Sequence, residues 1–366
     1  MKPVIAIPAI AALLYRAWSR RSLTPLGLVV AGLTASAHAV HPWSAPFALL
    51  GVFYLGGSRV TRVKEGVKAR LTLSATGAEG GEGPRTHIQV LANSIVATGL
   101  ILLHARLFFL YGSSSDLALD FFSFQGPHTA GDLLTVGIVA NYAAVAADTF
   151  SSELGILSKS SPRLITSPTL RVVPPGTNGG VTLTGLLAGA LGAALIGLTS
   201  AILIPFSPES SSLVTRAQFT LFVTIWGTLG SLLDSVLGGL LQASVVDKRS
   251  GKIVEGSGGK KVLIHPSSTK AAGTADVTST ATATQLRATE AIANTAALKG
   301  SRITGTSAAG QPARPHEEAH ESRRVESGAD LLDNNGVNVL MAAIMSFGAI
   351  GVTSWLWEVP IGDILA

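Results

Sequence analysis

The run "VTLTGLLAGALGAALIGLTSAILI", residues 181–204, contains no charged residue and decides the class of the fold. An apolar segment of this length can cross about 30 Å of hydrocarbon as a helix. The composition agrees, because 47% of the 366 residues are hydrophobic and 13% are charged, whereas soluble domains carry about 25% charged residues. The sequence therefore predicts an integral membrane protein built from helices.

Similar apolar runs lie on both sides of this segment. Because the first three are short or interrupted by proline, we expect an all-α, polytopic membrane bundle of about seven to eight transmembrane helices. The opening run could be a signal peptide, but it lacks a small-residue cleavage pattern before Arg16 and is interpreted as the first span. The expected spans are 4–16, 25–40, 45–57, 88–110, 131–150, 180–205, 214–243 and 336–358.

The basic residues predict the orientation. If the amino terminus is lumenal and every span crosses, the cytosolic segments 16–24, 58–87, 151–179 and 244–335 hold 3, 6, 3 and 12 of the 27 Lys and Arg residues. This asymmetry follows the positive-inside rule even without the long last segment. The net charge of +5 therefore reports topology, and we expect no nucleic-acid partner. No mitochondrial transit character is visible, so the endoplasmic reticulum is the expected membrane.

One segment differs from the rest in composition. Residues 244–328 are rich in Ser, Thr, Ala and Gly and nearly free of aromatic residues, so they bury too little apolar surface to offset ordering entropy. We expect a mostly disordered cytosolic insertion there. It would separate residues 1–243, the first part of the membrane core, from residues 329–366, which contain the last helix of that core.

Two acidic residues lie within expected spans near their cytosolic ends, and an ionisable group costs about 2.5–3.5 kcal/mol at mid-span. Asp148 lies at the cytosolic end of the fifth expected span, in "AADTFSSELG", and Asp234 lies in "GSLLDSVLGGLLQ". Gly227 and Gly230 share a helical stripe with Asp234, so a neighbouring helix can approach closely and Asp234 points into the bundle. Each acid alone has an ordinary explanation, as an interface carboxylate or as a structural hydrogen-bonding residue.

Side-chain amides occur at the same level of other spans. Gln89 and Asn93 lie four residues apart on one helical face, and Asn334 and Asn338 do the same in the last span. Such asparagines are equally suited to cap helices. It is the convergence of several polar faces at one level, on the cytosolic side, that favours a shared pocket.

The polar stretch "RVVPPGTNGGVTLTG", residues 171–185, precedes the apolar run quoted first. Proline and glycine suit a tight turn, and backbone N–H groups followed by a helix amino terminus favour an anion. Thr177 and Thr182 would add hydroxyl donors, and Arg163 and Arg171 would add charge for phosphate. The alternative is an ordinary interhelical turn with capping threonines.

Several classes of chemistry are excluded. The chain has no cysteine, which removes disulfides, thiol catalysis and Cys-type zinc sites. It contains neither a P-loop nor an HExxH motif. The stretch "GSGGKK" at 256–261 does not have the spacing of a P-loop and falls in the expected insertion. Carboxylate and amide oxygens suit a hard cation such as Mg²⁺, for which Asp148 and Asp234 are the candidate ligands.

The motifs "AADTFSSELG", "SPRLITSPTLRVVPPGTNGGVTLTG", "GSLLDSVLGGLLQ" and "LDNNGVN" together resemble those of one integral-membrane family. That family contains animal transmembrane protein nineteen, archaeal proteins of unknown function and the plant phytyl-phosphate kinase. More distantly, it is similar to phytol and dolichol kinases and CDP-diglyceride synthases. The resemblance covers residues 1–243 and 329–366, and departs at Asn178, where Ser is expected.

The resemblance implies a polyprenyl-phosphate kinase, or a related lipid phosphotransferase, that uses Mg²⁺ and a nucleoside triphosphate such as CTP. Its partners would be the bilayer, a polyprenyl phosphate and the nucleotide, and the sequence leaves protein partners open. Alternatives are a transporter of an anionic or phosphorylated solute, whose site would lie nearer the midplane, and a non-catalytic member of the family. Catalytic candidates are Asp148, Glu153 and Asp234; phosphate- or nucleotide-binding candidates are Arg163, Arg171, Gly176, Thr177, Gly179, Gly180, Asn93, Asn335 and Asn338.

Overall fold

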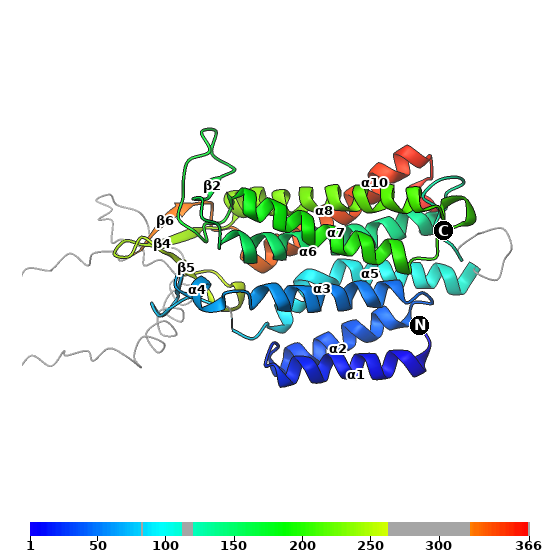
Figure 1. The fold of residues 1–366 in the computed structure, drawn as a ribbon, viewed down its shortest axis with the longest axis horizontal. Coiled ribbons are helices and arrows are strands. Elements are labelled where there is room, and N and C mark those ends of the chain that lie inside the picture. Colours follow the sequence, from blue (N-terminus) through cyan, green and yellow to red (C-terminus); the bar gives the residue numbers. More distant parts are fainter. Residues whose placement is uncertain (82, 112–119, 263–322, 365–366) are drawn as a thin grey trace, which may run out of the picture.

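The computed structural model describes residues 1–81, 83–111, 120–262 and 323–364. Within them, eight helices of 16 residues or more lie side by side along the long axis (Figure 1). They are α1 (Pro3–Ser19), α2 (Pro25–Val40), α3 (Ala45–Thr61), α5 (His87–Tyr111), α6 (Ala130–Gly155), α7 (Leu183–Leu203), α8 (Leu213–Leu241) and α10 (Asn334–Trp357).

Five of these helices, α5, α6, α7, α8 and α10, are long and apolar enough to cross a membrane. Helices α1 and α2 are shorter apolar helices, and α3 has 17 residues. The expected all-α polytopic bundle is therefore confirmed. The helices also begin and end within a few residues of the expected spans, because proline and hydroxyl residues such as Thr24 and Thr182 start them and glycine or polar residues follow them.

The two ends of the bundle differ. Both chain termini lie at one end, and the short strands gather at the other (Figure 1). We call the latter the strand end. It carries the five-residue helix α4 (Glu65–Ala69) and the pair β2 (Arg163–Leu164) and β3 (Gly180–Val181). It also carries a four-stranded sheet with the order β1-β5-β4-β6.

That sheet contains both ends of the segment expected to be disordered. Within 244–328, β4 (Ser244–Asp247) pairs antiparallel with β5 (Ile253–Glu255) and β6 (Arg323–Ser327), and β1 (Leu73–Ser74) joins β5. The expectation of disorder was therefore too broad at its two ends; residues 263–322 lie outside the described part of the chain. The expectation was too broad because it rested on the average composition of the whole segment, which hides a few apolar residues. Four buried apolar residues hold the sheet together: Val245, Val246, Ile253 and Val254.

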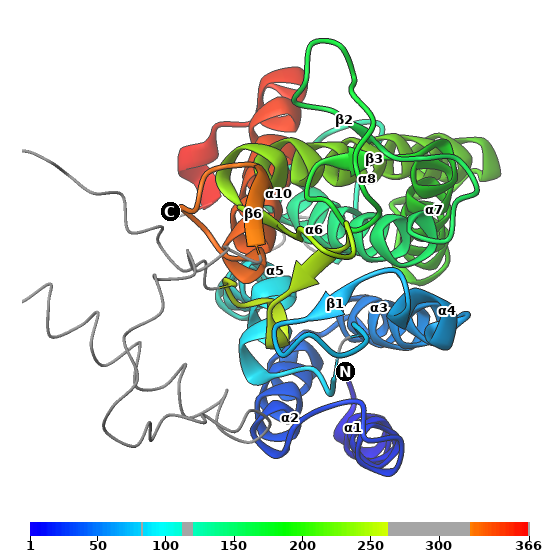
Figure 2. The same ribbon diagram turned by 90° about the vertical axis from the view of Figure 1, so that its left-hand side faces the viewer.

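Helix α6 forms the centre of the bundle. It packs against α3, α5, α7, α8 and α10, which surround it in the end-on view (Figure 2). In its most apolar stretch 89% of the residues are buried, against 28–44% in the other candidate spans. A polar side chain on α6 therefore faces protein or an internal cavity rather than lipid.

Candidate functional site

A cavity of about 660 Å³ opens at the strand end. Its walls come from the ends of α5, α6, α8 and α10, the loop before α7, and strands β4 and β5. Three of the residues named from the sequence, Arg163, Arg171 and Asn335, do not line it. The predicted residues that do are Asn93, Asp148, Glu153, Gly176, Thr177, Gly179, Gly180, Asp234 and Asn338.

Asp148 on α6 and Asp234 on α8 lie within hydrogen-bonding reach of each other in this cavity. The glycines of α8 explain how the two helices come so close. A Cβ on Gly230 would lie 2.6 Å from the Cβ of Ala144, and one on Gly227 would lie 2.7 Å from the Ala143 carbonyl oxygen. One turn beyond the contact of Gly230 with Ala144, the same two faces carry the two carboxyl groups.

Buried oxygen atoms without a hydrogen-bond partner occur on two residues that line the cavity. Among the described residues, these atoms are Oδ1 of Asp234 and Oδ1 of Asn338. Leaving a buried acceptor unpaired costs about 1–3 kcal/mol, so these atoms are suited to a ligand. Carboxylate and amide oxygens are what Mg²⁺ prefers, together with phosphate oxygens and water. The described residues contain no cluster of three or more His, Cys, Asp or Glu side chains that could hold a metal by itself.

The loop before α7 lies against α8, one turn beyond Asp234. Gly176 and Gly179 have φ of +86° and +78°, which favours glycine. A Cβ on Gly179 would lie 2.8 Å from the Cα of Gly239 and from the Ser235 carbonyl oxygen. The absence of a side chain therefore lets the loop backbone approach α8 and form one wall of the cavity.

The two threonines expected as phosphate donors already have partners. Thr177 is buried, and its hydroxyl donates to the Pro174 carbonyl oxygen at 2.7 Å. Thr182 is the N-cap of α7, and its hydroxyl oxygen accepts from the Gly185 N–H at 3.0 Å. Both hydroxyls thus shape the turn, as the alternative interpretation of this loop held, while the glycine backbone lines the cavity.

Arg163 and Arg171 do not line the cavity and have partners elsewhere. Arg171 pairs with Glu326 on β6 at 2.6 Å, and Arg163 donates to the Leu170 carbonyl oxygen at 3.1 Å. Sequence reasoning did not see Glu326 as a partner, because it lies 155 residues later in the chain. The assignment of these arginines to phosphate is corrected.

Other cations line the cavity instead: Arg85 before α5, Lys159 after α6, and Lys260 and Lys261 after β5. Lys261 pairs with Asp330 at 3.1 Å. Within the described part of the chain, no acidic partner is seen for Lys159 or Lys260. The positive charge for a phosphate group is thus present, but on residues that the sequence analysis missed.

The lysines after β5 belong to "GSGGKK", which was set aside for its spacing and its place in the insertion. In the structure the hairpin of β4 and β5 carries this stretch to the rim of the cavity. Gly258 and Gly259 have positive φ, and the Asn335 side-chain amide donates to the Gly258 carbonyl oxygen at 3.1 Å. Asn335 therefore supports the rim from behind. The run of glycine and lysine residues was the sequence signal that could have identified this stretch as part of the site.

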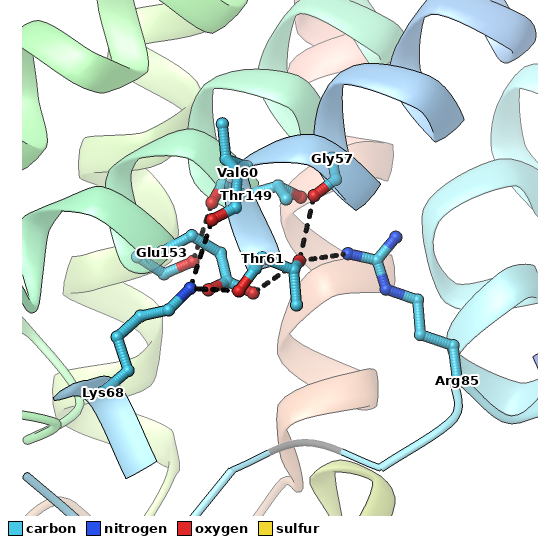
Figure 3. A network of polar contacts seen from close by, with 8 residues as sticks. Gly57, Val60, Thr61, Lys68, Arg85, Thr149 and Glu153 are labelled. Atoms are coloured by element: carbon cyan, nitrogen blue, oxygen red, sulfur yellow. Dashed lines mark hydrogen bonds and ion pairs between the residues drawn. The ribbon is translucent and has the colours of Figure 1, made fainter. Parts of the chain in front are cut away.

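Glu153 lines the cavity but is held in an ion pair. Its Oε2 pairs with Lys68 Nζ, and its Oε1 accepts from the Thr61 hydroxyl at 2.8 Å (Figure 3). The Glu153 side chain is 16% exposed, and Lys68 also donates to two carbonyl oxygens at the end of α3. With both carboxylate oxygens occupied, Glu153 joins α3, α4 and α6 and is poorly placed to act as a metal ligand.

The amide residues divide into two roles. Gln89 accepts from the Thr86 N–H at the start of α5, and Asn93 donates to the Gln89 carbonyl oxygen at 3.0 Å. The fully buried Asn141 links α6 to the Asn93 carbonyl oxygen. At α10 it is Asp333 that caps the helix, accepting from the Gly336 N–H, so the Asn338 amide oxygen remains available to the cavity.

The comparisons with known proteins concern the whole of this architecture. The family described as Integral membrane protein DUF92 matches residues 8–346. Protein PGR of Arabidopsis thaliana is 37% identical over 235 residues, which cover 63% of this chain and 75% of that protein. An uncharacterized membrane protein of Methanocaldococcus jannaschii is 44% identical over 107 residues, 29% of this chain and 40% of its own length.

Protein VTE6, chloroplastic, of Arabidopsis thaliana is 26% identical over 225 residues. The match covers 59% of this chain and 58% of that protein, so neither is matched over its full length. No solved structure matches.

Proposed function

Because the chain belongs to the family of integral membrane proteins described as DUF92, we propose that it is a nucleotide-dependent phosphotransferase that acts on a polyprenyl phosphate. The resemblance of its motifs to a family that includes the plant phytyl-phosphate kinase supports this substrate class. CTP or ATP would be the phosphoryl donor.

The observation that carries the proposal is the carboxylate pair with its unpaired oxygens. Asp148 and Asp234 line one cavity that is also lined by the glycine loop and by Lys159 and Lys260. Nearby carboxylates repel each other, and either a proton shared between them or a bound cation relieves this repulsion. A volume of about 660 Å³ also lies within the range of about 300–1,000 Å³ typical of small-ligand sites.

Each part of the cavity then has a role. Asp148 and Asp234 would hold Mg²⁺ with the Asn338 amide oxygen, and when bound the ion would neutralise charge on the phosphate oxygens. Lys159 and Lys260 would bind the phosphates of the nucleotide, and the loop at Gly176 and Gly179 would position them. Such a site acts chiefly by positioning and by neutralising charge.

The reaction needs no strong general base. An oxygen of the acceptor phosphate forms a bond to the terminal phosphorus of the nucleotide. The bond from that phosphorus to the bridging oxygen breaks, and the nucleoside diphosphate leaves with the electron pair. The products are a polyprenyl diphosphate and the diphosphate nucleotide.

The depth of the cavity favours this enzyme over a transporter. A transport site would lie near the midplane and open in turn to either side. Beyond Asp148, the residues of α6 from Leu133 to Ala147 are packed into the core, and Tyr142, Ala143 and Ala144 are fully buried. The proposed site lies at one end of the bundle, next to the strands.

The test is an assay of purified protein with labelled CTP or ATP and prenyl monophosphates of different length. We expect a prenyl diphosphate product with wild-type protein and at least about a 100-fold loss with Asp148→Ala. Lys159→Ala should raise KM for the nucleotide about tenfold, whereas Arg163→Ala, outside the cavity, should leave KM unchanged. Equal product from wild type and Asp148→Ala would falsify the assignment, and solute uptake without nucleotide turnover would favour transport.

For the membrane, we propose the endoplasmic reticulum with the strand end cytosolic. The basic residues support this orientation, since the Lys and Arg residues of the loops concentrate at that end. Two relatives come from other membranes or organisms, one being named chloroplastic and one coming from a cyanobacterium. Imaging of a tagged full chain against organelle markers decides the matter.

A further inference from the structure

We propose that an apolar groove among α1, α2, α3 and α5 binds the hydrocarbon chain of a single-chain lipid phosphate, and that Arg85 binds the phosphate. The inference rests on the proposed function for the role of that lipid as acceptor, but its binding can be tested without turnover. It assigns the hydrocarbon chain of the acceptor to a groove beside the polar cavity.

The first observation is that two cavities of opposite character share one wall. Beside the polar cavity lies a groove of about 80 Å³, and Arg85, Gln89 and Asn93 line both. The rest of the groove is mainly aliphatic and aromatic. It is lined by Ile10, Leu13, Leu14 and Ala17 of α1, Leu23 between α1 and α2, Ala31, Thr34 and Ala35 of α2, Leu50, Phe53 and Tyr54 of α3, and Val90 and Ser94 of α5.

The second observation is the place of the groove in the bundle. Helices α1 and α2 lie at the edge of the bundle in the end-on view, away from α6 (Figure 2). Helix α1 carries exposed apolar residues such as Tyr15 and Trp18, so this edge of the bundle faces lipid. A hydrocarbon chain can enter from the bilayer without passing through water, and its far end can remain in lipid.

The third observation is the position of Arg85 at the junction. Its N–H donates to the Ser22 carbonyl oxygen, and its own carbonyl oxygen accepts from the Thr24 N–H, each at 3.0 Å. Its guanidinium donates to the Thr61 hydroxyl at 3.2 Å (Figure 3). The backbone is thus tied to the connection between α1 and α2, and the side chain is tied to α3.

The guanidinium of Arg85 has more N–H groups than its contact with Thr61 uses. Among the described residues, Thr61 is the one side chain to which the guanidinium donates, and a guanidinium has five N–H groups. The remaining N–H groups suit a phosphate, which arginine binds bidentately. A cation at the mouth of an apolar groove fits an amphiphile with an anionic head, whereas a free nucleotide has no apolar chain for the groove.

The two substrates would meet in the polar cavity. The phosphate of the lipid would reach it from the Arg85 wall, and Lys159 and Lys260, which line the same cavity, would bind the nucleotide. The acceptor phosphate and the carboxylate pair then share one space, because Arg85, Asp148 and Asp234 all line the same cavity. Arg85 is therefore a binding residue for the acceptor and a determinant of its phosphate specificity.

The test uses the full chain in nanodiscs and a C20 prenyl monophosphate with a diazirine in the part of its chain nearest the phosphate. After irradiation without nucleotide or Mg²⁺, we expect labelled peptides from α1 and α2. The matched prenyl alcohol should label these peptides about tenfold less. Arg85→Gln should reduce labelling by the phosphate to the level of the alcohol, because the difference between the two probes is the arginine–phosphate contact.

Two variants close the groove from opposite walls, Ala31→Phe on α2 and Ile10→Trp on α1. Each should lower labelling by both probes at least about tenfold, since overpacking a small apolar site excludes the chain. Ser36→Phe is the matched control, because Ser36 is exposed on the same helix as Ala31 and lines neither cavity. It should label as wild type does. Melting temperature and elution volume show whether each variant is folded.

Labelling spread evenly over lipid-facing helices, or groove variants that are folded and label normally, would overturn the inference. Failure of this inference can be distinguished from failure of the proposed function. If the groove is labelled in an Arg85-dependent way but the protein shows no phosphotransfer, only the proposed function is contradicted. If folded Ala31→Phe and Ile10→Trp proteins keep normal phosphotransfer, only the assignment of the groove to the lipid chain is contradicted.

Discussion

Asp234 carries a cost that the stability of the bundle does not explain. Its carboxyl group lies beside that of Asp148, and one of its oxygens is buried without a donor. Groups of this kind concentrate where a protein gives up stability for function. The resulting predictions concern what happens when the charge is removed and when a cation is added.

Asp234→Asn removes one of the two neighbouring negative charges while keeping the size of the side chain. We expect the ligand-free protein to gain about 1 kcal/mol, or about 2–4 °C in Tm. Wild type should be stabilised by millimolar Mg²⁺ with nucleotide, whereas the variant should not. Thermal unfolding in detergent measures both effects, and Mg²⁺ protection of the variant equal to that of wild type would contradict the metal assignment.

Glu153 is a residue whose role the structure changes, from catalytic candidate to partner of Lys68. Glu153→Gln should destabilise the protein by about 3 kcal/mol, because it leaves a largely buried lysine unpaired. Lys68→Met combined with Glu153→Gln should restore most of that loss. Chemical denaturation of the single and double variants gives the coupling. If the folded double variant has lost phosphotransfer although its stability is restored, Glu153 is catalytic after all.

At the scale of elements, the contact of α6 with α8 sets the distance between the two carboxyl groups. Gly230 faces Ala144 with no room for a Cβ. Small residues at helix crossings in membranes commonly allow such backbone approach. The site is therefore as sensitive to this crossing as to its own side chains.

Gly230→Ala should push α8 away from α6. We expect a loss of about 2 kcal/mol in stability from overpacking, together with reduced protection by Mg²⁺. Gly351→Ala on α10 is the matched control, since a Cβ there meets nothing within 4 Å, and it should be neutral or stabilising by up to about 1 kcal/mol. Comparable losses in the two variants would mean that the crossing is unimportant.

Local patterns in the sequence were sufficient for the helices and for the two acids. The apolar runs predicted the spans, and the glycine-rich stripe that contains Asp234 predicted that its side chain points into the bundle. The capping role of Thr182 was also readable as an alternative, because a hydroxyl before an apolar run is a local signal. Each of these inferences needs only residues within a turn or two of one another.

Pairings between distant segments were not readable. Arg171 was assigned to phosphate because its partner, Glu326, lies on a strand that composition had placed in a disordered segment. Lys260 was passed over for the same reason. Arg85 follows a glycine-rich linker, and nothing local indicates that its side chain reaches α3. Such errors arise where tertiary contact overrides local character.

At the scale of the whole molecule, the helices alternate in direction and both termini lie at the end opposite the strands (Figure 1). The polar faces that the sequence placed in separate spans therefore meet at one end. Under the orientation proposed from the basic residues, that end is cytosolic. The chain has no cysteine, which makes the orientation directly measurable.

Single cysteines should react from opposite sides of sealed vesicles. Thr169→Cys lies at the strand end, between β2 and β3, and Ser211→Cys precedes α8 at the other end; both native residues are exposed. An impermeant maleimide added to sealed microsomes, whose cytosolic face is outward, should label Thr169→Cys only, and detergent should expose Ser211→Cys. The reverse pattern would invert the proposed orientation while leaving the cavity as described.

The small sheet at the strand end has a consequence for how this chain can vary. Strands β5 and β6 lie on either side of β4, and neighbouring strands are about 4.8 Å apart. Strands β5 and β6, which precede and follow residues 263–322 in the chain, are thus roughly 10 Å apart across the sheet. Lengthening such a connection costs only about 0.6 kcal/mol per doubling. Evolution can diversify this stretch, and an experimenter can graft a reporter domain into it, while the helices keep their places.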